Sequence, residues 1–128
     1  MPILVPVSWG ELLDKITILD IKLRRIDDPA KLANVRNERE ALGGVVAAAG
    51  ALPETAGAVI DGLCAVNEAL WDIEDEIRDC ERRKDFGPRF LELARSVYHS
   101  NDRRAALKRE LNQLLGSELV EEKSYHAY

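Results

Sequence analysis

An apolar seam runs without interruption through the middle of the chain and constrains the fold more than any other feature of the sequence. Its residues alternate spacings of three and four, and they are Ala56, Val59, Leu63, Val66, Leu70, Ile73, Ile77 and Cys80. A seven-residue apolar repeat sustained over this length is typical of a helix that packs left-handedly along another helix. We therefore predict an all-α protein built around one long helix, from Glu54 to Lys84, about 47 Å in length.

This helix is longer than a compact domain of 128 residues is wide, because such a domain is roughly 36 Å across. Three arrangements reconcile the two lengths: an elongated molecule, a kinked helix, or a second copy of the chain that covers the overhang. We expect a homo-oligomer, at least a dimer, in which the apolar residues Ile3–Val7 are a candidate for exchange between copies.

Local signals divide the first part of the chain into two further helices. Ser8 and Glu11 form the S-x-x-E pattern of a capping box. The apolar stripe that follows consists of Leu12, Ile16, Leu19, Leu23 and Ile26. Asp28 and Pro29 are suited to the cap and first turn of the second helix. Gly43-Gly44 then weakens that helix, so the segment up to residue 50 is either a frayed continuation or a loose connection.

The last part of the chain predicts a turn and one or two helices. Gly87 is suited to a left-handed C-cap and Pro88 to a helix start, which places the turn at residues 85–88. Residues 100–102 interrupt the apolar pattern of the next helix, and Gly116 ends it. The predicted domain spans residues 1–128 as an antiparallel bundle of four to five helices. A short extended arm (residues 1–7) precedes it, and a polar tail (residues 117–128) follows it.

The charge balance argues against several classes of partner. The 18 basic and 23 acidic residues give a net charge of −5, whereas nucleic acids and anionic membranes select clustered Lys and Arg. One basic run is interpreted as a solvated helix face, and it comprises Arg103, Arg104, Lys108 and Arg109. No stretch reaches the ~20 apolar residues of a membrane span, and the first residues lack a basic leader pattern. We expect a soluble, cytoplasmic protein that binds neither nucleic acid nor membrane, with Cys64 and Cys80 as free thiols.

An acidic helix face offers one route to catalysis. Four of its carboxylates stand at i, i+3, i+4 and i+7, and they belong to Asp72, Asp75, Glu76 and Asp79. With Glu38 and Glu40 they resemble the acidic helices on which all-helical nucleotide pyrophosphatases hold Mg²⁺, although the paired-glutamate spacing of those enzymes is not reproduced. Nearby arginines favour a solvated face instead. We therefore assign no metal, no cofactor and no catalytic residue.

A polar stripe beside the seam is the better candidate for a ligand site. It consists of Asn67, Trp71, Glu74 and Arg78, which step by four, three and four residues. A carboxylate and a guanidinium that flank a seam are half-buried and need partners. We predict that Asn101, Asp102 and Arg103 of the next helix meet this stripe and form a pocket for a small anionic ligand or a peptide. The alternative is structural: a helical ion pair, a core tryptophan, and a cap at residue 101 or 102.

Four blocks of sequence carry a resemblance that covers nearly the whole chain. The blocks read VSWGELLDKITILDIK, VNEALWDIEDEIR, FLELARSVYHSNDRRAALKRELN and SELVEEKSY. They resemble a family of short bacterial all-helical proteins to which no activity is assigned. Relatives in that family accompany surface-polysaccharide glycosyltransferases, so the resemblance implies an accessory role in surface-polysaccharide biosynthesis.

A second resemblance concerns the first helix alone. Its residues LLDKITILD (12–20) resemble the opening motif of the all-helical chorismate mutases, L-R-x-x-I-x-x-L-D. Those enzymes grip a substrate carboxylate with the arginine of this motif. Because Leu13 stands at that position, mutase activity is not expected.

These observations favour a non-enzymatic binding or accessory protein. His99 and His126 have no metal-ligand spacing, and no nucleophile motif or phosphate-binding glycine loop is present. The alternative is a small-substrate enzyme that acts on an anionic sugar or a nucleotide, such as a Mg²⁺-dependent helical pyrophosphatase.

Overall fold

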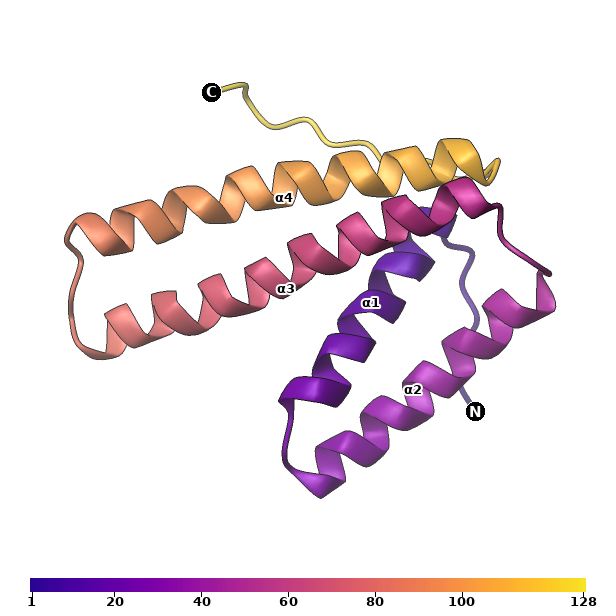
Figure 1. Cartoon of the computed structure of the whole chain (residues 1–128), viewed down its shortest axis with the longest axis horizontal. Coiled ribbons are helices and arrows are strands. Elements are labelled where there is room, and N and C mark those ends of the chain that lie inside the picture. Colours follow the sequence, from indigo (N-terminus) through magenta and orange to yellow (C-terminus); the bar gives the residue numbers. More distant parts are fainter.

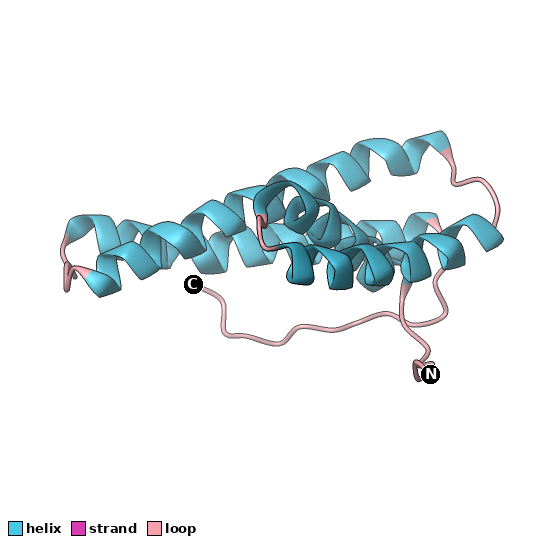
Figure 2. Cartoon of the chain, turned by 90° about the horizontal axis from the view of Figure 1, so that it is seen from below, coloured by secondary structure: helices cyan, strands magenta, loops and turns pink.

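The computed structural model describes residues 1–128 and contains four helices and no strand (Figures 1 and 2). The helices are α1 (Trp9–Arg25), α2 (Pro29–Ala48), α3 (Glu54–Arg82) and α4 (Pro88–Leu114). This confirms the all-α prediction and the single long helix along the seam. Both cysteines are free. No helix is long and apolar enough to cross a membrane.

The helices α3 and α4 form an antiparallel hairpin that is longer than the rest of the molecule (Figure 1). Helix α1 packs against both of them and against α2, whereas α2 contacts α1 alone. The far part of the hairpin, residues 73–97, therefore extends beyond the other helices, and we call it the α3–α4 extension (Figure 1). The molecule is elongated, which is one of the three arrangements that the helix length allowed.

The hydrophobic core lies where α1 crosses the near end of the hairpin. Its buried members are Leu13, Ala56, Val59, Leu63, Leu107 and Leu111. Helix α1 approaches α4 closely at Gly10, where a Cβ atom would lie 2.4 Å from the carbonyl oxygen of Lys108. The Gly10 amide donates a 2.7 Å hydrogen bond to Oδ1 of Asn112 at the same crossing. Only glycine permits this contact, because any side chain would push the two backbones apart.

The start of α1 confirms half of the predicted capping box. Ser8 Oγ accepts a hydrogen bond from the Glu11 amide at 3.1 Å. The Glu11 carboxylate does not return to Ser8 and instead contacts Lys108 of α4. The cap of α2 is as predicted, with Asp28 accepting from the Ala30 amide and Pro29 in the first turn.

The buried face of α1 differs from the predicted apolar stripe. Leu12 and Leu19 are buried as expected, but Ile16, Leu23 and Ile26 are only half-buried. The remaining buried positions beyond Gly10 are Leu13, Asp14, Thr17 and Ile21. The reason is that α1 is covered by three helices and not by one, so more than one stripe is removed from water.

One prediction was wrong, the left-handed C-cap at Gly87, whereas the continuation of the helix beyond Gly43-Gly44 and a single last helix were both among the alternatives. Helix α2 continues through Gly43 and Gly44, and α4 continues through residues 100–102. The left-handed residue in the turn after α3 is Lys84 (φ 56°), whereas Gly87 (φ −81°) is extended and precedes α4. Asp85 Oδ1 accepts from the Gly87 amide at 3.1 Å, so the turn depends on a side-chain contact that a glycine preference does not reveal.

The two ends of the chain have no secondary structure and differ in their contacts with the helices. Residues 1–7 form an exposed apolar arm, in which Ile3 and Leu4 keep 88% and 93% of their surface. The tail (residues 117–128) runs back along α4 (Figures 1 and 2). Its contacts with α1 and α4 shape the candidate site.

Candidate functional site

A buried polar node joins α1, α3 and α4. Asp14 of α1 is 1% exposed, and Thr17 and Asn67 beside it are also buried. Asn67 Nδ2 donates to Asp14 Oδ1 and to Thr17 Oγ1, each at 2.9 Å. Thr17 Oγ1 in turn donates to the Asp14 carbonyl oxygen at 2.8 Å. The node holds one carboxylate inside the protein, and a buried carboxylate is stable there only with hydrogen-bonding or charged partners.

Arg104 of α4 is the charged partner of this carboxylate. Its Nε donates to Asp14 Oδ1 at 2.9 Å, and its Nη2 donates to Oδ2 at 2.5 Å. This bidentate hydrogen bond to Asp14 raises the pKa of Arg104 above its usual value, against a smaller effect of desolvation. The Arg104 side chain is still 31% exposed. One edge of the guanidinium is therefore fixed by the protein interior while the other faces outward.

A second network links the start of α1 to α4 and the tail. Lys108 Nζ donates to Glu11 at 2.7 Å and to Glu121 at 3.1 Å. Ser8 Oγ donates to the other oxygen of Glu121 at 2.5 Å. Desolvation favours a lower pKa for Lys108, but the hydrogen bonds that it donates to the two carboxylates outweigh this effect and raise the pKa. Burial likewise favours a higher pKa for Glu121, but hydrogen bonds from Ser8 and Lys108 lower it below its usual value.

The rest of the tail is attached to α4 by charged and aromatic contacts. Glu122 accepts from Arg109 at 3.1 Å. Lys123 and the Tyr128 hydroxyl both contact the carboxylate of Asp102. All of these tail residues are exposed, so the tail is held as a strap over α4 and not as part of the core.

A cleft of about 630 Å³ opens between α4 and this strap. We call it the cation cleft, and its lining residues are Asn101, Arg104, Ala105, Lys108, Glu122, Lys123, Ser124 and Tyr125. Arg104 uses two of its five N–H donors on Asp14, and Lys108 uses two of its three on carboxylates. Asn101 is half-buried and forms no side-chain hydrogen bond within the protein. The cleft is thus rich in unused hydrogen-bond donors.

The structure places the predicted polar stripe outside this cleft. Asn67 is buried in the node beneath α1, and Trp71 is half-buried. Glu74 and Arg78 pair with each other at 3.3 Å, with 49% and 77% of their side chains exposed. The expectation that this pair is half-buried was wrong, because no third helix packs on the α3–α4 hairpin in the extension (Figure 1). No residue of the stripe lines the cation cleft or any of four other cavities of the chain.

The second group of predicted site residues, Asn101, Asp102 and Arg103, lies partly beside the cation cleft. Asn101 and Asp102 are half-buried, and both face the strap: Asn101 lines the cation cleft, and Asp102 binds Lys123. They do not cap a new helix, since α4 is continuous through them. Arg103 is exposed and has no ion pair. The structure therefore brings Asn101 and Asp102 together with the tail, and not with Glu74 and Arg78.

The acidic face does not gather into a metal-binding arrangement. Asp72 pairs with Arg25, Glu76 with Arg89, and Asp79 with Arg82. Glu38 and Glu40 are exposed on α2, which makes no contact with α3. No three His, Cys, Asp or Glu side chains stand in positions to share a metal ion. The geometry gives the magnesium alternative no support.

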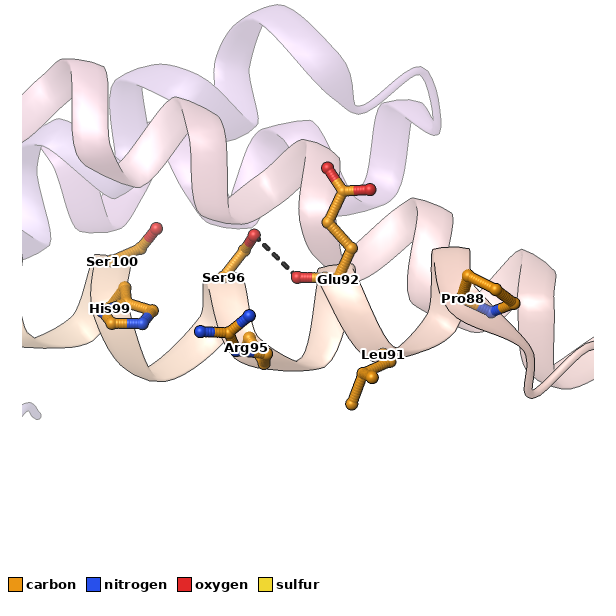
Figure 3. Close-up of a pocket in the computed structure, with 7 residues that line it drawn as sticks. All are labelled: Pro88, Leu91, Glu92, Arg95, Ser96, His99 and Ser100. Carbon is orange, nitrogen blue, oxygen red and sulfur yellow. Dashed lines mark hydrogen bonds between the residues drawn. The ribbon is translucent and has the colours of Figure 1, made fainter. Parts of the chain in front are cut away.

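A third surface, on the outer face of α4, is also a weak candidate. It is a hollow of about 460 Å³ whose lining residues all come from α4, among them Leu91, Glu92, Arg95 and His99 (Figure 3). Ser96 Oγ donates to the Glu92 carbonyl oxygen at 2.9 Å, a contact within one helix. With a single helix as its wall, this hollow has no second element to enclose a ligand.

Sequence reasoning missed the two basic residues that α4 contributes to the cation cleft. Arg104 and Lys108 were interpreted as part of a solvated face, but both carry inward ion pairs with α1. One signal was available: Asp14 and Thr17 are polar residues flanked by apolar ones on a helix with an otherwise apolar face. A buried carboxylate on α1 needs a basic partner from another part of the chain, and the basic run of α4 contains the largest group of candidate partners.

Comparison with protein-family models, with curated proteins and with solved structures finds no match to this chain. A proposal about function therefore depends on the geometry described above.

Proposed function

We propose that the chain is a non-enzymatic binding protein, and that its site is the cation cleft between α4 and the tail. The observation that carries the proposal is the set of unused donors on Arg104, Lys108, Lys123 and Asn101, which face one cavity. The ligand is a small molecule with an acidic group, either a carboxylate or a phosphate. The resemblance of the sequence to bacterial proteins that accompany glycosyltransferases adds an accessory role in surface-polysaccharide biosynthesis to this proposal.

The buried node supports the proposal because it fixes the position of Arg104. Asp14 holds Nε and one Nη2 donor, so the guanidinium loses little freedom when a ligand binds its outer edge. Charge-assisted hydrogen bonds from a guanidinium to a carboxylate or phosphate are among the strongest in proteins. The neighbouring carboxylates balance the charge of the cleft, which favours a ligand with one acidic group over a polyanion.

Binding is favoured over catalysis by the kind of side chains in the cleft. They are donors and paired carboxylates, and none forms a pair of nucleophile and base within hydrogen-bond distance. An enzyme would need such a pair, or a metal, close to the bound ligand.

Titration calorimetry with inorganic phosphate and with acetate tests this function on the full chain. Asn101→Ala removes an unpaired donor of the cleft and leaves every contact of the tail in place, so we expect roughly tenfold weaker binding. Arg103→Gln is the matched control, because Arg103 neighbours the cleft residues in sequence but is exposed and unpaired. Its affinity should stay within about twofold of the unmodified chain.

Two results would overturn the proposal. One is the absence of binding heat for every anion at millimolar concentration. The other is equal weakening by Asn101→Ala and Arg103→Gln, which would show attraction to the general surface charge. Turnover of a bound phosphate ester would instead favour the enzymatic alternative.

A further inference from the structure

The aromatic residues near the tail are unusually concentrated. The chain has three tyrosines and two histidines, and all five lie around one second cavity beside the cation cleft. This cavity has a volume of about 690 Å³, and Tyr98, Tyr125, His126 and Tyr128 line it. The His99 ring contacts Tyr98 in a tilted arrangement and Tyr128 edge to face, with ring centroids 4.9 and 4.8 Å apart. We call this cavity the tyrosine cleft.

The tyrosines of the tail are not buried anchors. Tyr125 and Tyr128 keep 84% and 74% of their surface exposed. Tyrosines that only fasten a tail to a helix would bury their rings against it, because that burial is the source of the attachment. Here the rings of Tyr98 and Tyr128 are tilted by 52° to each other at 5.1 Å and border a hollow. An aromatic wall around an open cavity is the arrangement that accepts the face of another ring.

The tyrosine cleft is continuous with the cation cleft. Asn101, Lys123 and Tyr125 line both cavities. The Lys123 ammonium lies 5.5 Å from the centre of the Tyr125 ring, where the two cavities meet. A single ligand can therefore reach Arg104 with one end and the tyrosines with the other.

We propose that the tyrosine cleft binds the ring of the same ligand whose acidic group enters the cation cleft, so that the ligand is a ring-bearing monophosphate. This inference rests on the proposed function and adds the chemical class of the ligand. Phosphate oxygens accept hydrogen bonds from Arg104 and Lys108, and the ring lies against the tyrosines. Asp102, which lines the tyrosine cleft and not the cation cleft, supplies a carboxylate for a polar group on the ring. A hexose phosphate and a nucleoside monophosphate share this chemistry.

The test compares three probes by titration calorimetry: inorganic phosphate, a hexose 6-phosphate and a nucleoside 5′-monophosphate. One of the two ring-bearing probes should bind at least tenfold more tightly than inorganic phosphate, and its identity distinguishes sugar from nucleoside. Tyr98→Ala should reduce that affinity about tenfold and leave the affinity for inorganic phosphate within twofold, because Tyr98 lines the tyrosine cleft and not the cation cleft. Phe86→Ala is the matched control, because Phe86 is an exposed aromatic residue at the α3–α4 turn, 55% exposed and outside both clefts.

Tyrosine ring signals in proton NMR provide a second readout that does not depend on a variant. All three tyrosines report on this one cleft, and the indole signals of Trp9 and Trp71 serve as internal references outside it. The bound ring should shift the signals of Tyr98 and Tyr128, which lie outside the cation cleft, and inorganic phosphate should not. Equal affinities for all three probes with unmoved tyrosine signals would overturn the inference and leave the proposed function standing. No binding of any probe would remove both.

Discussion

The two ends of the α3–α4 hairpin contain the same apolar repeat and differ in what covers it. At the near end α1 packs on the hairpin, and Leu63 and Leu111 are completely buried. In the α3–α4 extension only Cys80 and Leu93 are buried, while Ile73 and Ile77 remain half-exposed. A heptad repeat is therefore sufficient to form a helix and to pair it with one neighbouring helix. Complete burial of the seam side chains needs a third helix packed on that pair.

The polar contacts differ between the two ends in the same way. The pair of Asp14 and Arg104 is enclosed by three helices, with Asp14 1% exposed. The pair of Glu74 and Arg78 in the extension is surrounded by solvent. Loss of one partner from the pair of Asp14 and Arg104 is costly because the carboxylate is buried. The attraction between Glu74 and Arg78 is weakened by the surrounding water.

The largest difference between the two ends should appear on truncating seam residues. Leu63→Ala at the near end removes a buried side chain and should lower the free energy of unfolding by about 2–5 kcal/mol. Ile77→Ala in the extension should cost less than about 1.5 kcal/mol, because its side chain already contacts water. Urea denaturation of both variants measures the two losses. Equal losses at a concentration-independent midpoint would contradict the comparison.

Isosteric removal of one charge should give a smaller but parallel difference. Asp14→Asn leaves Arg104 without its carboxylate and should cost about 2–3 kcal/mol, which lowers the melting midpoint by roughly 6–15 °C. Glu74→Gln, the matched change in the extension, should cost less than about 0.5 kcal/mol. Thermal melts of both variants check the prediction. A fall of about 10 °C for Glu74→Gln would mean that something covers the extension.

Self-association is a third way to test the comparison, because a second copy of the chain could cover the seam residues that are half-exposed in the α3–α4 extension. We predict that a second copy packs along the half-exposed seam of the extension, which continues the core without a break in the repeat. Light scattering at micromolar concentration should then give at least twice the chain mass of 14.3 kDa. Phe86→Asp, at the exposed tip of the extension, should shift the mass toward the monomer. A monomeric mass for the unmodified chain would refute this prediction.

The smallest expected effect concerns acid and the near end alone. The pKa of Glu121 is lowered in the folded chain, so its contacts with Ser8 and Lys108 stabilise the protein above the usual carboxyl pKa. That contribution is lost as the pH falls through and below about 4.3. Thermal midpoints at pH 6 and pH 4 should therefore fall less in Glu121→Gln than in the unmodified chain. Glu118→Gln is the control, since Glu118 is an exposed tail residue without an ion pair.

Much of the fold could be predicted because its signals are local. The spacing of the seam predicts α3, and Ser8, Asp28 and Pro29 mark helix starts through contacts within one turn. Gly43 and Gly44 weaken a helix by a modest amount that is insufficient to end α2, so the sequence left a continuation and a connection both open. The error at Gly87 also has a local cause. The turn before α4 uses the Asp85 side chain, and a glycine preference alone therefore misplaces the left-handed residue.

The candidate site was far less predictable, because its partners are distant in sequence. The polar stripe was derived from one helix face, and a helix face alone does not reveal which neighbour will cover it. Asn101 and Asp102 were recognised from the broken apolar pattern of α4, but their partners proved to be tail residues. Nothing in the spacing of Glu121 or Tyr128 predicts that the tail turns back along α4.

The sequence by itself determined the four helices and which face of α3 packs against a neighbouring helix. It could do so because helical hydrogen bonds and apolar periodicity act within a few residues. Only the tertiary structure decided that Asp14 meets Arg104, 90 residues away, and that Tyr128 reaches Asp102, 26 residues away. The first contact depends on how α1 and α4 cross, and the second depends on where the tail lies along α4. Such crossings are set by the close approach at Gly10 and by the packing of the core, which no single helix contains.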